Sequence, residues 1–238
     1  MKTTHANTKD MSEDIRNTNV YYDKNKCKTK NNQKNKNNDN KITQKNIEEN
    51  VKCNEIKSLN VMFTNVDSLT NKINEIEMYA ELYKADIILL TEHLSKNPSS
   101  KFDNIFNLKN FNCLEENTGR GVCLFYKDNL NVVKNDMISD LFKPSLFVSV
   151  KTEDKPINIG LIYRSPNNEE KENKKLNYQI NFATKKLNNL YLFGDFNHPS
   201  IDWEFNYCKR HENHCDSLFL FEVNKFNLFT SNKKRESQ

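Results

Sequence analysis

Several features that would place a protein in a membrane or outside the cell are missing from this sequence of 238 residues. Its longest hydrophobic run, around "DIILLT" (86–91), is far shorter than the ~20 apolar residues that a membrane-spanning helix needs. No N-terminal segment has the basic, apolar and small-residue order of a signal peptide. The six cysteines lie far apart and form no dense disulfide framework, which favours free thiols in a reducing compartment. We therefore expect an intracellular protein without a membrane anchor.

Hydrophobic residues are also scarce, at 36%, and this fraction predicts that part of the chain does not fold. Residues 1–57 are rich in Asn and Lys, as in "KNKCKTKNNQKNKNNDNK", and their apolar residues follow neither a helical nor a strand period. We predict a disordered tail over 1–57 and one folded domain over 58–238. The chain has four glycines, and all lie in or beside expected strands of the folded part, where they mark turns or close backbone approach.

The segment from residue 59 onward has the regular pattern of an α/β fold with strands in the majority. Strands are expected at 59–65, 85–92, 121–127, 145–150, 157–164 and 190–196, from alternating or continuous apolar runs. A helix capped by Asp67 or Ser68 should follow the first strand, and a second helix should precede the last. The first helix joins two strands, so we expect a strand–helix–strand unit.

The segment "CKRHENHC" (208–215) contains two cysteines and two histidines, residue types that bind zinc. The spacing of Cys208, His211, His214 and Cys215 matches no standard zinc pattern. The same segment would open an apolar helix, whose buried face we predict from Leu218, Phe221 and Phe226. We therefore favour a structural role over a zinc site.

Polar residues recur where the expected strands end. Asn65 ends the first strand and Glu92 the second, Tyr163 stands near the end of the fifth, and Asp195 near the end of the last, with Asn197 two positions on. Strand ends of a layered α/β fold can meet at one edge, where active sites tend to be built. Taken singly, such residues are most often turn, cap or half-buried strand residues.

Together, these five side chains offer hard oxygen ligands that suit Mg²⁺, which takes substrate phosphate as a further ligand. A phosphate ester is therefore the expected substrate. Glu92 would hold the metal, and Asp195 would orient or deprotonate an attacking water. The side chains of Asn65, Tyr163 and Asn197 would steady the phosphate oxygens. The net charge of +4 permits contact with phosphates without requiring it.

Five segments resemble a known family in their order and spacing: "TNVDSL", "DIILLTEHL", "GRGVCLFYKDNL", "IGLIYRSPN" and "LFGDFNHPSIDW". They resemble the endonuclease/exonuclease/phosphatase domain, above all the endonuclease that precedes the reverse transcriptase in non-LTR (LINE-like) retrotransposons. The resemblance covers residues 59 to about 229, and its most specific pieces are "YRSPN" and "GDFN" followed by "IDW". It implies a four-layer α/β sandwich that cleaves DNA phosphodiesters with Mg²⁺ or Mn²⁺.

The resemblance also implies roles for the strand-end residues. They are catalytic for Tyr163, Asp195 and Asn197 and metal-binding for Asn65 and Glu92. Arg164 matches an arginine common in the retroelement branch and would contact the DNA backbone; the alternative is a solvated charge at a strand end. DNA as the substrate would place the protein in the nucleus.

The sequence departs from the family at its C-terminal end. The family closes with a further aspartate on a late strand and with a Ser-Asp-His whose histidine is central to catalysis, and no Ser-Asp-His occurs here. We expect His198 to be structural, the last strands of one sheet to be missing, and one sheet edge to be open. Loss of a catalytic base typically costs ~10²–10⁴-fold, so we expect impaired nicking activity.

Three alternatives stay open. A non-catalytic remnant could bind nucleic acid through the Lys-rich tail and the metal edge without cutting it. A phosphatase or lipid phosphodiesterase could use the same fold. Finally, the chain could lack a stable fold, in which case it would show no cooperative melting.

Overall fold

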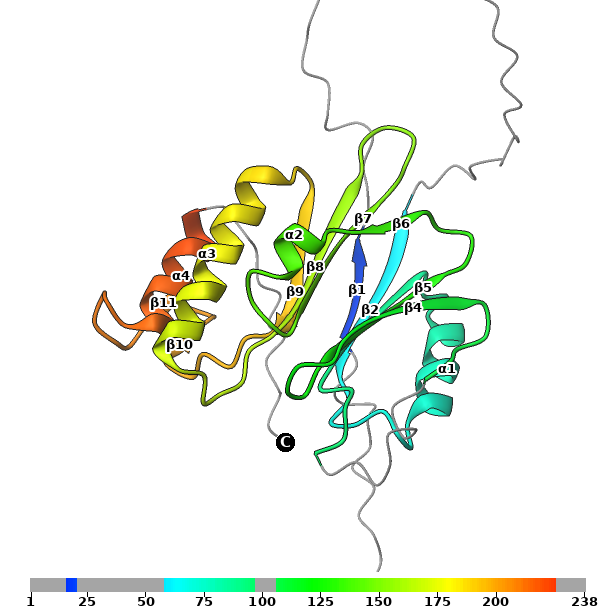
Figure 1. Cartoon of the computed structure of the whole chain (residues 1–238), viewed down its shortest axis with the longest axis horizontal. Helices are drawn as coiled ribbons and strands as arrows, with labels where there is room; N and C mark the ends of the chain where they lie inside the picture. The colour runs from blue at the N-terminus through cyan, green and yellow to red at the C-terminus, as the bar shows by residue number, and fades with distance from the viewer. Residues whose placement is uncertain (1–15, 21–57, 97–105, 226–238) are drawn as a thin grey trace, which may run out of the picture.

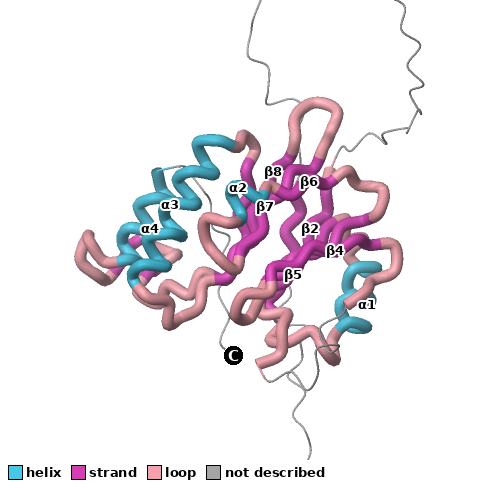
Figure 2. The backbone as a smooth tube through the Cα atoms, in the orientation of Figure 1, coloured by secondary structure: helices cyan, strands magenta, loops and turns pink. Residues whose placement is uncertain are grey.

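The structure, a computed structural model, describes residues 16–20, 58–96 and 106–225. Two mixed β-sheets pack face to face, and helices cover their outer sides (Figure 1). In Figure 2 the strands form a central band between α1 on one flank and α3 and α4 on the other. None of the helices in the described part of the chain has the length and hydrophobicity that a membrane crossing requires.

The first sheet has the strand order β1-β2-β3-β5-β4. Its elements are β1 (Arg16–Val20), β2 (Leu59–Asn65), α1 (Ile73–Leu82), β3 (Ile87–Thr91), β4 (Phe111–Glu116) and β5 (Val122–Lys127). Strands β2 and β3 are parallel, and α1 connects them, so this is the predicted strand–helix–strand unit.

The second sheet has the order β6-β7-β8-β9, and β10 and β11 form a separate two-stranded ladder. Its elements are β6 (Val132–Lys134), α2 (Asp136–Ser139), β7 (Ser145–Val150), β8 (Ile157–Tyr163), α3 (Glu170–Lys186) and β9 (Leu190–Asp195). The chain continues through β10 (Ile201–Asp202), β11 (Tyr207–Cys208) and α4 (Cys215–Lys225). Strands β8 and β9 are parallel and joined by α3, so each sheet contains one parallel pair with a helical crossover.

Strand alternation divides the apolar side chains among three clusters. Odd-numbered residues of β2 and β3, such as Val61 and Leu89, meet Ile159 and Leu161 of β8 between the sheets. Neighbouring residues such as Ile88 point to the other face and pack under α1. The outer face of the second sheet packs against α3 and α4. The layers run helix, sheet, sheet, helix, which confirms the predicted four-layer α/β sandwich.

Helix α4 buries a different face from the one predicted. Leu218 and Phe221 have relative exposures of 38% and 62%, while Phe219, Leu220 and Val223 are buried; Phe226 lies outside the described residues. The prediction of the buried face was therefore wrong. The cause lies in a buried polar residue, Asp216, which shares one helical face with residues three, four and seven positions later.

The N-cap predicted for α1 at Asp67 or Ser68 is also wrong, because the helix begins at Ile73 with Lys72 as its N-cap. Ser68 and Leu69 instead donate backbone hydrogen bonds to the carbonyls of Glu92 and His93. The chain therefore runs alongside the end of β3 before it turns into the helix.

Strand β1 lies within the segment predicted as a disordered tail. It pairs antiparallel with β2, with Arg16 opposite Phe63 and Val20 opposite Leu59. Backbone groups on the edge of β2 provide this pairing, so neither composition nor period reveals it. The remainder of the predicted tail lies outside the described residues. At β9, where an open edge was expected, the strand is outermost in its sheet and all six of its residues are partly exposed.

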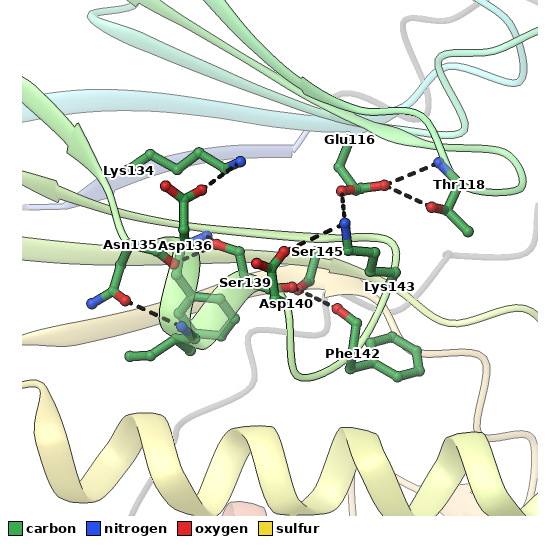
Figure 3. Close-up of polar contacts among 12 residues, drawn as sticks. Glu116, Thr118, Lys134, Asn135, Asp136, Ser139, Asp140, Phe142, Lys143 and Ser145 are labelled. Atoms are coloured by element: carbon green, nitrogen blue, oxygen red, sulfur yellow. Dashed lines mark hydrogen bonds and ion pairs between the residues drawn. The ribbon is translucent and has the colours of Figure 1, made fainter.

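The loop between α2 and β7 connects the two sheets through polar contacts (Figure 3). Lys143 donates to Glu116 at the end of β4, with a distance of 2.9 Å between Nζ and Oε2. The Ser145 hydroxyl donates to the Phe142 carbonyl over 2.7 Å, and Pro144 accepts a hydrogen bond from the backbone N–H of Tyr163. This loop therefore holds the end of β8 against the start of β7.

A substitution at Gly194 tests how closely the backbones of β8 and β9 approach each other. A Cβ at Gly194 would lie 2.1 Å from the carbonyl oxygen of Ile162, a backbone atom that cannot rotate away. We expect Gly194→Ala to lower the free energy of unfolding by about 2–4 kcal/mol, measured by urea denaturation. Gly119→Ala is the control, because its φ is 62° with no atom within 4 Å, and it should cost only about 1 kcal/mol. Equal, small losses for the two variants would contradict this packing.

Candidate active site

The predicted site residues meet where the two sheets end, at the same opening of the sandwich. Asn65 lies opposite Thr91 in the parallel pair β2–β3, and Tyr163 lies opposite Asp195 in β8–β9. Asn65, Tyr163 and Asp195 each share the strand face that points between the sheets. Directly below them, Phe63 of one sheet packs on Phe193 of the other, with ring centroids 6.2 Å apart. Alternation therefore directs polar groups of both sheets into one space.

Asn65 joins the two carboxylates of this site. Its Nδ2 donates to Glu92 Oε1 over 3.0 Å and to Asp195 Oδ2 over 3.1 Å. Its Oδ1 accepts the backbone N–H of Asp67 over 3.0 Å, which fixes the orientation of the amide. One neutral side chain thus holds carboxylates from opposite sheets beside each other.

Two site residues adopt backbone conformations that L-residues rarely adopt. Glu92 has a φ of 55° and Asn197 a φ of 47°, each just past the end of its strand. Such left-handed residues cost free energy and cluster at functional sites, where surrounding structure maintains them. At Glu92, the backbone N–H donates to the Gly121 carbonyl over 3.0 Å. The turn re-aims Glu92, which a continued strand would point away from Asn65.

Burial raises the pKa of two groups in the site. Burial raises the pKa of Asp195, and the charge of Glu92 adds to this, while hydrogen bonds from Asn65 and Asn197 oppose it. Burial also raises the pKa of Tyr163 to about 12, with the charge and hydrogen bond of Glu92 as the next causes. Tyr163 is therefore a neutral hydrogen-bond donor at physiological pH, and Asp195 is a carboxylate that takes up a proton more readily than usual.

Arg164 does not have the surface position that both interpretations of the sequence required. Its residue exposure is 4%; its Nε donates to Asn173 over 2.8 Å and its Nη1 to the Asn197 carbonyl over 2.6 Å. The Asn197 side chain returns a hydrogen bond to the Arg164 carbonyl over 2.7 Å. The prediction of a DNA contact or a solvated charge is therefore corrected, since Arg164 braces the loop that carries Asn197.

Arg120 is a site residue that the sequence analysis missed. Its Nη2 lies 3.1 Å from Glu92 Oε2 and 2.5 Å from Asp67 Oδ1. Antiparallel pairing sets Val122 opposite Thr91, and this register brings the residues before β5 beside the end of β3. The only sequence signal was the "GRG" turn before the strand, and the identity of the neighbouring strand cannot be read from it.

The histidines next to the site are structural. His93 is 0% exposed. The His198 ring stacks on Phe219, and its Nδ1 lies 2.9 Å from Asp216 Oδ1, which links the "GDFN" loop to α4. Burial lowers the pKa of His198 to about 4, so the ring is neutral at pH 7.

Among the described residues, the ligand atoms of Cys215 gather with those of His198 and Asp216. That cluster contains neither Cys208 nor His211. The zinc set considered for "CKRHENHC" is therefore not assembled, in keeping with the structural interpretation of that segment.

The donor set of the opening fits a divalent cation such as Mg²⁺ or Mn²⁺. It offers carboxylate oxygens from Glu92 and Asp195, and both carboxylates already accept from the same Asn65 amide. Hard oxygen donors with few carboxylates are what Mg²⁺ prefers. The Glu92 side chain is 16% exposed, so a cation could reach it from solvent.

Comparison with solved structures finds the same architecture elsewhere, whereas neither a protein-family model nor a curated protein sequence matches the chain. The endonuclease domain of TRAS1, a telomere-specific non-LTR retrotransposon, aligns with a TM-score of 0.53 and 16% identity, over 70% of this chain and 71% of that one. The chain has the endonuclease/exonuclease/phosphatase fold.

Two further solved structures are similar to the chain over about the same fraction of its length. The 3′ phosphatase NExo from Neisseria, bound to a product DNA hairpin, has a TM-score of 0.46 and 15% identity, over 70% of each chain. An AP endonuclease from Archaeoglobus fulgidus has a TM-score of 0.42 and 14% identity, also over 70% of each chain. One fold can host many activities, so the function of this chain depends on the residues of its site.

The raised pKa of Asp195 predicts how stability depends on pH. Because the folded state binds this proton more tightly than the unfolded chain, the contribution of Asp195 is full below pH 3.8 and is lost as the pH rises through the folded-state pKa. At pH 7 the buried Asp195 carries a charge that costs free energy of folding, and Asp195→Asn removes that charge. We expect the variant to melt at a higher temperature than the parent at pH 7 in EDTA, and the difference to vanish near pH 3.5. A variant that is less stable than the parent by the same amount at both pH values would contradict the assignment.

Proposed function

We propose that the chain carries a divalent-metal-dependent phosphodiesterase site that nicks DNA, and that it derives from a retrotransposon endonuclease. The observation that supports this most is the network of Asn65, Glu92, Tyr163 and Asp195, which draws on both sheets at one opening of the sandwich. The order of the "YRSPN" and "GDFN…IDW" segments supports the retroelement branch.

In this proposal Asp195 is the group that accepts the proton of the attacking water. A general base works best when its pKa approaches the operating pH, and burial moves the pKa of Asp195 in that direction. Asn65 and Asn197 each hydrogen-bond to Asp195 and hold its carboxylate in one orientation. The attacking oxygen forms the new P–O bond as the P–O bond to the sugar oxygen breaks, and the leaving oxygen takes up a proton from solvent water.

Tyr163 and Glu92 take complementary parts. Tyr163 retains its proton, because its pKa is raised to about 12, and its hydroxyl can donate to a phosphate oxygen as charge develops there. Glu92, with the Asn65 amide oxygen as a further candidate ligand, would hold Mg²⁺ or Mn²⁺, which would supply Lewis-acid charge to the phosphate. Positioning of phosphate and water between the two sheets contributes the remainder.

A second candidate function is nucleic-acid binding without cleavage. It is favoured by one observation: within the described part of the chain, no histidine takes part in the hydrogen bonds and ion pairs of the site. The family's catalytic histidine has no counterpart there. We therefore propose that this network alone catalyses nicking slowly. The chain would still bind DNA phosphates where cleavage is lost.

The decisive experiment is nicking of supercoiled plasmid with Mg²⁺. The parent should convert supercoiled to open-circular DNA, and Asp195→Ala should lower the rate by at least about 100-fold, because it removes the base. Asp136→Ala is the matched control: it also removes one carboxylate, but from an exposed position that pairs with Lys134, and it should stay within about twofold of the parent. Equal rates for parent and Asp195→Ala would reject the proposed base.

The binding alternative is tested separately, with a labelled duplex and fluorescence anisotropy. Glu92→Ala should retain duplex affinity if the chain is a binding module, and that affinity should fall steeply with salt. Hydrolysis of inositol phosphates by a parent that leaves DNA intact would instead assign the site to a phosphatase or lipid phosphodiesterase.

A further inference from the structure

Arg120 fills the side of Glu92 that Asn65 leaves open. Asn65 binds Oε1 of the carboxylate, and Arg120 Nη2 lies 3.1 Å from Oε2. The same Nη2 lies 2.5 Å from Asp67 Oδ1, so one guanidinium nitrogen serves two acids. The side chains of Arg120 and Glu92 are 15% and 16% exposed, which shields this ion pair more than an ordinary surface pair. Both oxygens of the proposed metal-binding carboxylate are therefore engaged.

The backbone around Arg120 keeps its guanidinium at this position. The turn that carries it has glycines on both sides, with φ values of 62° at Gly119 and 67° at Gly121. The Arg120 carbonyl accepts the backbone N–H of Leu94 over 3.2 Å. A Cβ at Gly121 would lie 2.5 Å from the ring of His93, so the turn sits directly on the residue after Glu92. Arg120 is thus held beside Glu92 by the backbone.

The arrangement carries a cost that displacement of the guanidinium would relieve. Arg120 Nε is buried and has no hydrogen-bond partner among the described residues. A buried donor without a partner destabilises the state that contains it. Asp67 is 63% exposed and lies farther toward solvent, so Arg120 retains an acid to pair with when it leaves Glu92.

We propose that Arg120 sets the divalent-cation affinity of this site, as a resident cation on Glu92 Oε2 that must move aside toward Asp67 when the metal binds. This inference rests on the proposed metal site. The guanidinium and the metal compete for Glu92 Oε2, because two cations cannot occupy the same lone pairs of one oxygen at close range. It predicts weak metal binding by the parent and tighter binding once the guanidinium is removed.

The test is titration of the full chain with Mn²⁺, followed by the electron paramagnetic resonance signal of the free ion, without DNA. Arg120→Gln should tighten Mn²⁺ binding about tenfold, because it removes a positive charge from the ligand oxygen. Arg120→Lys retains the charge with a compact head group and should fall between the parent and Arg120→Gln. Adding Glu92→Gln to Arg120→Gln should abolish the gain. Circular dichroism melts verify that each variant folds. One folded Arg120 variant is enough to test the predicted change in Mn²⁺ affinity.

Lys96→Ala is the matched control. It also removes one cation that contacts Asp67, at 3.3 Å, but Lys96 is 67% exposed and has no contact with Glu92 among the described ion pairs. Its Mn²⁺ affinity should match that of the parent. Equal gains for Lys96→Ala and Arg120→Gln would overturn the proposal in favour of a general charge effect. Unchanged affinity in Arg120→Gln, or no Mn²⁺ binding by any chain, would also overturn it. The titration contains no DNA, so its result is independent of the nicking assay that tests the proposed function.

Discussion

One side-chain amide, that of Asn65, holds together two carboxylates that would otherwise repel each other. Glu92 comes from the first sheet and Asp195 from the second, and each accepts one hydrogen bond from Asn65 Nδ2. Two like charges brought out of water cost free energy unless donors or cations compensate them. Arg120 supplies one such cation, on the side of Glu92 away from Asn65. The organisation of the opening follows from this need to compensate negative charge.

The sandwich provides the frame in which that compensation is possible. Each sheet contributes a parallel pair whose strands end at the same level, Asn65 beside Thr91 and Tyr163 beside Asp195. Alternation points these groups inward, above an apolar core, and Glu92 and Asn197 adopt strained left-handed conformations where the strands end. Strain of this kind persists only where surrounding contacts maintain it. Buried Arg164, which bonds to the carbonyl of Asn197, is one of those contacts.

The sequence predicted what depends on local pattern and missed what depends on pairing. Strand ends were visible as apolar runs that stop at polar residues, so Asn65, Glu92 and Asp195 could be named in advance. The position of Arg120 depends on which strand lies beside β3, and the burial of Arg164 depends on the loop at Asn197, 33 residues farther along the chain. The face of α4 was mispredicted because a buried Asp216 does not look like a core residue. The catalytic and metal-binding roles of the site residues stay predictions.

The claim that Glu92 holds a divalent cation at this opening can be tested most directly by diffraction from crystals soaked in Mn²⁺, with data collected for anomalous scattering. We predict one strong anomalous peak within coordination distance of Glu92 Oε2, with the Arg120 guanidinium moved toward Asp67. An opening without such a peak, with Arg120 still paired to Glu92 at saturating Mn²⁺, would contradict the account.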